Sequence, residues 1–158
     1  MSVNSVFFLA VGIGIVAGLR AMTAPAAVSW AAHLGWLNPH DSLLSFMGST
    51  VAVAIFSLAA LAEYVNDKLP KTPSRTATPS LIARILMGGL SGACLCASAG
   101  QSLIAGALLG GIGSLIGTYG GYQVRTRLTR GLKVKDIFIA ILEDLVAIGF
   151  AFFLVSRG

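Results

Sequence analysis

The sequence predicts an all-α protein built as a polytopic bundle of transmembrane helices. Its 158 residues are 56% hydrophobic and only 11% charged, whereas soluble domains carry about 25% charged residues. Several apolar runs approach or exceed the ~18 residues that are typical of a membrane span. We expect one integral membrane domain over residues 1–158.

The apolar runs predict about six helical segments with a broken first pair. Gly18, Arg20 and Thr23 interrupt the apolar pattern between the first two segments, which are short for a bilayer. Thr23 is suited to cap a new helix, with Pro25 in its first turn. One kinked helix over 4–36 is the alternative, and it would move the N-terminus across the membrane. The expected segments are 4–18, 24–36, 44–69, 79–98, 102–128 and 135–156.

Two basic loops predict the orientation of the chain. The loops 68–84 and 125–135 are separated by two spans, so both lie on one side. Excess Lys and Arg mark cytoplasmic loops, which places both loops in the cytoplasm and both termini outside. The net charge of +5 is explained by these span ends, and we expect no nucleic-acid partner. Thr78 is suited to cap the helix after the first loop, with Pro79 at its first position.

The two halves, about 1–78 and 79–158, each contribute three segments. In opposite orientation, such halves match the plan of an inverted-repeat transporter. The segments ALAEYV and AILEDLV of the two halves are only weakly similar in sequence, and their glutamates differ in membrane depth. Inverted 3+3 halves therefore stay an open alternative, and no functional prediction rests on them.

The acids within the spans form the first candidate site. A rise of ~1.5 Å per residue puts Glu63 about 7–8 Å and Glu143 about 10 Å from the cytoplasmic edge. Asp67 shares a helix face with Glu63, whereas Asp144 lies ~100° around its helix from Glu143. Intramembrane ionisable groups usually point into the bundle and pair with one another. The expected partners of the two glutamates are Arg20, Arg84 and Arg125.

These charges have two interpretations. In the first, they are ion pairs that hold six small helices together. In the second, they line a polar cavity that opens to the cytoplasm and binds an ion or a phosphorylated headgroup, and the number of acids favours it. The predicted transport or ion-binding residues are Arg20, Glu63, Asp67, Glu143 and Asp144.

The loop PKTPSRTATPS is the second candidate site. It combines cations and hydroxyls and leads into a helix N-terminus, which favours phosphate. An ordinary cytoplasmic loop near anionic lipid has the same composition. The predicted anion- or headgroup-binding residues are Lys71, Arg75 and Arg125.

Glycines recur at steps of mostly three and four residues in two of the segments. Such stripes are typical of close helix packing within a bundle or between subunits, and a sliding surface or pore wall is the alternative. The glycines concerned are Gly88, Gly89 and Gly92, and Gly106, Gly110, Gly113, Gly117, Gly120 and Gly121.

Three stretches, GLRAMTAPAAVSWAA, DKLPKTPSRT and ILEDLVAIG, together resemble a family of small bacterial inner-membrane proteins. The family is known only as a domain of unknown function, number four-one-two-six. The resemblance covers nearly the whole chain and implies a multi-pass protein of the bacterial inner membrane. It implies no activity, substrate, cofactor or site residue.

Three functions fit these observations. The first is a small transporter or channel for an ion or small polar solute, a homo-oligomer in the lipid bilayer, with Arg20 as counter-ion of Glu63 and Glu143. The second is an inner-leaflet phospholipid-headgroup binder or Mg-dependent lipid enzyme, with Asp67 among the metal ligands. The third is a structural membrane subunit.

Catalysis is the less favoured of these functions. The sequence has no HExxH, paired CxxC or GxSxG motif, and no catalytic residue is predicted. The only expected cofactor is a bound cation, whose identity the sequence leaves open.

Overall fold

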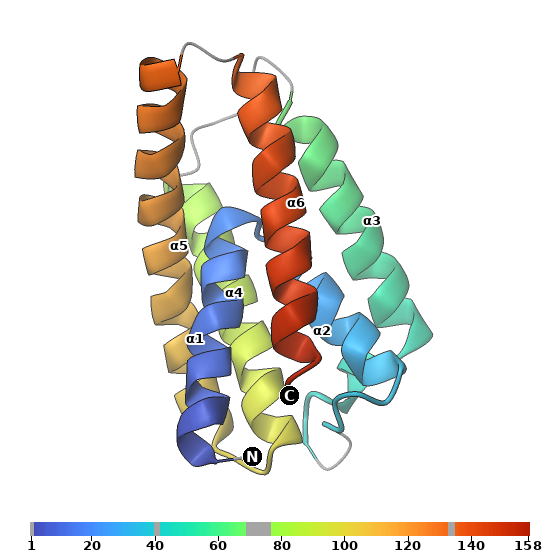
Figure 1. The fold of residues 1–158 in the computed structure, drawn as a ribbon. Helices are drawn as coiled ribbons and strands as arrows, with labels where there is room; N and C mark the ends of the chain where they lie inside the picture. The colour runs from blue at the N-terminus through green and yellow to red at the C-terminus, as the bar shows by residue number, and fades with distance from the viewer. Residues whose placement is uncertain (1, 40–41, 69–76, 133–134) are drawn as a thin grey trace.

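The computed structural model describes residues 2–39, 42–68, 77–132 and 135–158. Within these ranges every secondary-structure element is a helix, as predicted, and the helices form one bundle (Figure 1). The elements are α1 (Val3–Leu19), α2 (Thr23–His33), the 3-10 helix η1 (Ser45–Gly48), α3 (Thr50–Asn66), α4 (Thr78–Ser98), α5 (Leu103–Leu132) and α6 (Asp136–Val155).

Three of the described helices, α4, α5 and α6, are long and apolar enough to cross a membrane. The helices α1 and α3 are apolar but shorter, with 17 residues each. A helix of that length spans about 26 Å, close to the ~30 Å hydrocarbon core of a bilayer. Large apolar side chains such as Phe8, Leu108 and Leu145 are exposed on the outside of the bundle, which indicates a membrane protein.

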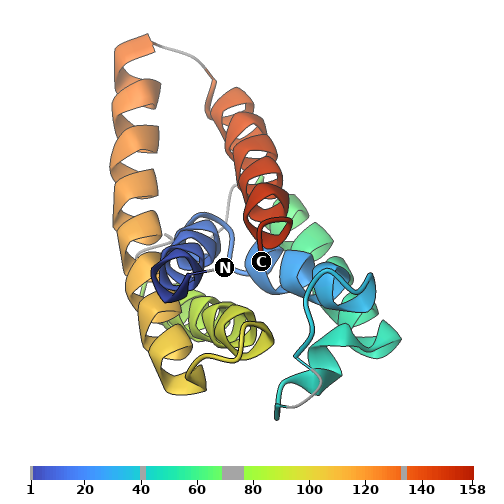
Figure 2. The same ribbon diagram turned by 60° about the horizontal axis from the view of Figure 1, so that its bottom comes forward.

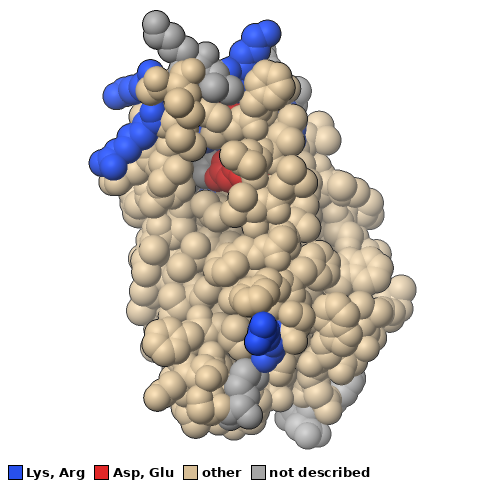
Figure 3. All heavy atoms as spheres, in the orientation of Figure 1, with Lys and Arg blue, Asp and Glu red and all other residues tan. Residues whose placement is uncertain are grey.

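The two ends of the bundle differ in charge. The end of α5 and the start of α6 meet at one end, and both chain termini lie towards the other (Figure 1). The first end carries exposed Lys68, Arg127, Arg130 and Lys135, and we call it the basic end. Figure 3 shows basic side chains gathered there on a face that is otherwise mostly uncharged.

The first two helices are separate rather than one kinked helix. Helix α1 rises towards the basic end and stops at Leu19, and α2 turns back towards the opposite end (Figure 1). Residues 20–22 form the break between them. Figure 2 shows α1 lying between α5 and α6.

Two of the predicted helix caps are wrong. Met22 occupies the N-cap position of α2, and Thr23 is the first helical residue. The Thr23 hydroxyl instead bonds the Tyr64 hydroxyl at 2.5 Å. In α4 the N-cap is Ala77, and Thr78 is already helical.

The third predicted segment, 44–69, is interrupted rather than continuous. Its first part is η1, and the backbone is extended at Ser49. Ser49 Oγ accepts a hydrogen bond from the Ala52 N–H at 3.1 Å, which is the geometry of a helix N-cap. A serine that caps one helix cannot at the same time continue another, so α3 begins only at Thr50.

Helices α1, α4 and α5 pack with their backbones in contact, as the glycine pattern predicted. A Cβ added at Gly110 would meet the carbonyl oxygen of Gly88, and one added at Gly14 would meet that of Gly110. Gly106 lies against Gly92 in the same way. A Cβ on Gly120 would meet nothing within 4 Å, so the packing stripe ends before that residue.

The substitution Gly110→Ala is expected to destabilise the protein by roughly 1–3 kcal/mol, because its methyl group forces the α4 and α5 backbones apart. Thermal unfolding in detergent micelles measures the effect. Gly120→Ala, in open space on the same helix, is the matched control and is expected to unfold at or slightly above the wild-type temperature. Equal melting temperatures for the two variants would contradict this account of the stripe.

Candidate functional site

The end of α1 is held by side chains from two other helices. The Gly18 carbonyl accepts hydrogen bonds from Arg84 Nη1 of α4 at 2.5 Å and from Thr118 Oγ1 of α5 at 3.3 Å. Ser80 Oγ, one turn before Arg84, accepts from Arg84 Nε at 3.2 Å. An unsatisfied backbone group inside a bilayer costs several kcal/mol, so these contacts let the chain break at this depth.

The start of α2 is held by a carboxylate from α3. Glu63 Oε1 accepts a hydrogen bond from the Ala21 N–H at 2.8 Å, and Glu63 Oε2 accepts from the Met22 N–H at 2.9 Å. The carboxylate also lies 3.8 Å from Arg84 Nη2. Glu63 therefore supplies the cap that Thr23 was predicted to provide, and a negative charge suits the positive end of the helix dipole.

Arg20, in the break itself, is fully buried. Its guanidinium nitrogens lie 2.6 Å from Asp67 Oδ2 of α3 and 2.5 Å from Asp144 Oδ1 of α6. Glu143 Oε2 lies at 3.9 Å from Nη2, and the Ala140 carbonyl accepts a hydrogen bond from Nη2 at 3.4 Å. One cation is thus shared by acids from two helices.

Arg125 of α5 extends these contacts to the basic end. Its guanidinium forms two hydrogen bonds with Asp136, at 2.9 and 2.6 Å. It also lies 3.3 Å from Asp67 and 3.5 Å from Glu143. We define the charged network as the side chains joined by these ion pairs together with Lys68: Arg20, Asp67, Lys68, Arg125, Asp136, Glu143 and Asp144.

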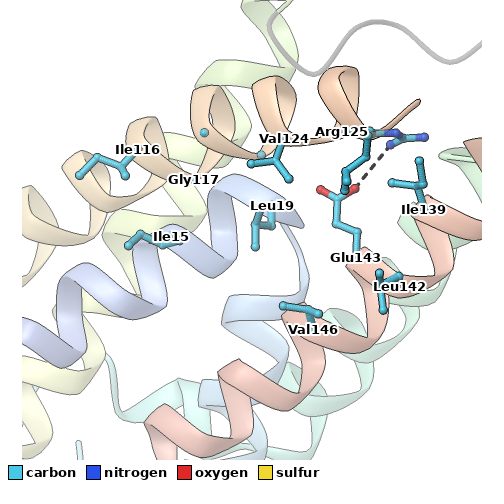
Figure 4. Close-up of a pocket in the computed structure, with 13 residues that line it drawn as sticks. Ile15, Leu19, Ile116, Gly117, Val124, Arg125, Ile139, Leu142, Glu143 and Val146 are labelled. Carbon is cyan, nitrogen blue, oxygen red and sulfur yellow. Dashed lines mark ion pairs between the residues drawn. The ribbon is translucent and has the colours of Figure 1, made fainter. Parts of the chain in front are cut away.

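The adjacent acids of α6 have different positions in this network. Asp144 is buried and lies between Arg20 and Lys68, whose Nζ is 2.9 Å from its Oδ2. Glu143 lies on the side of α6 that faces Arg125 (Figure 4). Although the two side chains lie ~100° apart around the helix, both are within ion-pair distance of Arg20, and Asp144 is the closer of the two.

The ion pairs of Arg20 are close but poorly aligned for hydrogen bonding. Nη1 of Arg20 is within ion-pair distance of Asp67. Oδ1 of Asp144 is within ion-pair distance of Arg20. Neither atom, nor Arg20 Nε, has a hydrogen-bond partner among the described residues. The guanidinium is therefore held by close ion pairs with the two acids and by the backbone carbonyl of Ala140.

Two cavities flank the charged network. The first, of about 380 Å³, lies between the break, α3 and α4, and its lining includes Glu63, Asp67 and Arg84. The second, of about 390 Å³, is an apolar groove between α1, α5 and α6 that has Arg125 and Glu143 among its lining residues (Figure 4). Because Arg20 pairs with acids of both, the network separates one cavity from the other.

The structure gathers most of the predicted site residues at one depth. Arg20, Asp67, Glu143 and Asp144 belong to the network, and Glu63 caps α2 beside it. Arg125 lies in the network rather than in a separate anion site. The predicted anion-binding residues Lys71 and Arg75 lie outside the described residues.

Two members of the network were missed from the sequence. Lys68 does not share the helix face of Glu63, yet its flexible side chain reaches Asp144 across the bundle. Asp136 pairs with Arg125 across the α5–α6 connection, and nothing in its spacing indicates this contact. The described residues contain no group of three or more His, Cys, Asp or Glu side chains placed to hold a metal ion.

The comparisons with known proteins give one result. The search of curated proteins and the search of solved structures found no match. A family model, "Domain of unknown function (DUF4126)", matches residues 7–156. That range includes the break between α1 and α2 and every member of the charged network. The chain therefore belongs to the family of this domain of unknown function.

Proposed function

We propose that this protein is a small membrane transporter or channel for an ion or small polar solute, with the charged network as its ion-responsive site. Ionisable residues inside a membrane are costly and typically mark ion pathways or proton relays. Transporters commonly form their sites where a membrane helix is broken, because the helix ends there present unpaired backbone groups and dipoles. The break between α1 and α2 and the charges around it have both features.

The observation that carries the proposal is the position of Arg20. Its buried guanidinium is held between Asp67, which lines the cavity beside α3 and α4, and the acids of α6. A proton or cation that binds Asp67 weakens the pair between Asp67 and Arg20. The guanidinium keeps its contact with Asp144 and moves towards Glu143, which lies 3.9 Å from Nη2, and this shift couples the first cavity to the second.

In this mechanism the other acids have separate tasks. Both carboxylate oxygens of Glu63 accept backbone N–H groups, so Glu63 positions the break and is not the carrier. Asp67 is the acid that binds the solute. Asp144, which also pairs with Lys68, stays paired with Arg20 after the guanidinium has moved. Removing the charge of Asp67 should therefore stop transport without opening the break.

The orientation that we propose places the basic end in the cytoplasm of a bacterial inner membrane. Lys68, Arg127, Arg130 and Lys135 lie at that end, and cytoplasmic loops carry the excess of Lys and Arg. The cavity lined by Asp67 then receives its solute from the cytoplasmic side.

Proton flux into vesicles that contain the reconstituted full chain and a pH-sensitive dye tests this function. We expect Asp67→Asn to lower the flux by about tenfold or more, because the amide carries no titratable proton. Arg157→Gln is the control, since Arg157 is exposed at the opposite end and lies outside the charged network, and it should retain the wild-type flux. A wild-type flux no greater than that of empty vesicles, for protons and for Na⁺ and K⁺, would remove the proposal.

A further inference from the structure

The apolar groove between α5 and α6 has the length of one membrane leaflet. On α5 its lining runs from Ile116 to Leu128, twelve residues or about 18 Å of helix. Half of the hydrocarbon core of a bilayer is about 15 Å thick. A molecule that fills the groove from its charged end therefore reaches about the depth of one leaflet.

The groove is slender for its length. A volume of about 390 Å³ spread over about 18 Å of helix gives a mean cross-section of about 22 Å². A hydrocarbon chain, whose atoms keep contact distances of about 4 Å, fills a groove of this cross-section.

The walls of the groove are suited to hydrocarbon. Its lining is almost entirely apolar, and its two charged side chains, Arg125 and Glu143, lie 3.5 Å apart and face each other (Figure 4). In the space-filling view an acidic group is visible at the bottom of a hollow on this face (Figure 3). The groove is thus open to the side, as entry of a lipid chain from the bilayer requires.

Exposed cations lie at the basic end, beyond the Leu128 end of the groove, and none of them lines it. Arg127 and Arg130 are exposed on the last turns of α5, and Lys135 is exposed just before α6. The nearby acid Asp136 is held by Arg125 at 2.6 Å. At the other end, around Ile116, the lining contains no charged residue.

We propose that this groove binds one acyl chain of an anionic phospholipid, whose phosphate lies beside Arg127 and Arg130. The bound chain covers Glu143 on the side that faces the bilayer, so it seals the charged network from the hydrocarbon. This site goes beyond the transport proposal and does not depend on it.

Native mass spectrometry of the full chain tests the site directly. The protein is released from nanodiscs that contain equal amounts of phosphatidylglycerol and phosphatidylcholine, and the retained lipid is counted. We expect one phosphatidylglycerol per chain. Gly120→Phe should reduce this retention by about tenfold, because Gly120 lines the groove and a side chain there meets open space.

Gly149→Phe is the matched control. Gly149 is an exposed helical glycine of α6 whose Cβ would also meet nothing within 4 Å, but it does not line the groove. This variant should retain lipid as the wild type does. The surface variant Arg127→Gln/Arg130→Gln should reduce the preference for phosphatidylglycerol over phosphatidylcholine by about tenfold.

Three results would overturn the site. One is equal lipid retention by the Gly120→Phe and Gly149→Phe variants. Another is equal retention of the two lipids by the wild type. The third is a lipid-free dimer that Gly120→Phe converts to a monomer, because the groove would then be covered by a second copy of the chain.

Discussion

Replacing Arg20 by glutamine is expected to destabilise the protein by roughly 3–5 kcal/mol, the cost of removing one partner from a buried ion pair. The substitution leaves Asp67 and Asp144, which lie 2.6 and 2.5 Å from the guanidinium, without the cation that separates them. Their mutual repulsion inside the bundle opposes folding. Chemical unfolding in detergent micelles measures the loss.

A second substitution separates charge from packing in this result. Adding Asp144→Asn to Arg20→Gln removes one acid along with the cation and should recover roughly half of the lost stability. Arg157→Gln, at an exposed arginine of the opposite end, should change stability by no more than about 0.5 kcal/mol. A wild-type stability for Arg20→Gln alone would show that the ion pairs of Arg20 do not hold the helices together.

Replacing Glu63 by alanine is expected to cost roughly 2–6 kcal/mol, because two backbone N–H groups lose their acceptor at roughly 1–3 kcal/mol each. The groups are those of Ala21 and Met22, and Arg84 loses its carboxylate partner in the same step. Glu63→Gln keeps one carbonyl oxygen and should cost about half as much.

The melting temperature and the amide hydrogen exchange of Ala21 and Met22 measure this effect. Exchange at both amides should accelerate in Glu63→Ala more than in Glu63→Gln. Asp136→Ala, which removes an exposed carboxylate from the same network, should leave both amides protected. If all three variants exchanged alike, Glu63 would not be the cap of α2.

Hydropathy and helical rise were enough to predict the helices and to bring the charges of different helices to the same end of the bundle. The apolar runs gave five α-helices within a few residues of their ends, because a bilayer fixes both the length and the polarity of a span. The polar residues of GLRAMTAP marked the break correctly, and the rise per residue placed Glu63 and Glu143 near Arg20.

Rotation about each helix axis was harder to predict, since it depends on packing across the whole bundle. Spacing alone predicted Glu143 as the partner of Arg20, whereas the structure places Asp144 closer. The acceptor for the start of α2 is Glu63, forty residues further along the chain, so no local pattern at Thr23 indicates it. The predicted homo-oligomer and the inverted halves stay predictions.

The structure gives the charges a role in packing, and it also places a cavity on one side of them. Arg20 joins α3 and α6 to the break, as the first interpretation of the charges requires. The cavity lined by Asp67 adjoins the same network, and the ion binding of the second interpretation stays a prediction. A variant that keeps the fold but lacks the charge of Arg20 distinguishes the two interpretations.

The most direct test of the transport account is proton flux through the double variant Arg20→Gln/Asp144→Asn, reconstituted as folded protein and compared with the wild type. Arg20 is the cation whose partners change in the proposed cycle, and Asp144 is one of the acids that pair with it. The account predicts a flux that is lower by about a hundredfold. A folded double variant with wild-type flux would contradict it and would leave the charged network with packing as its only role.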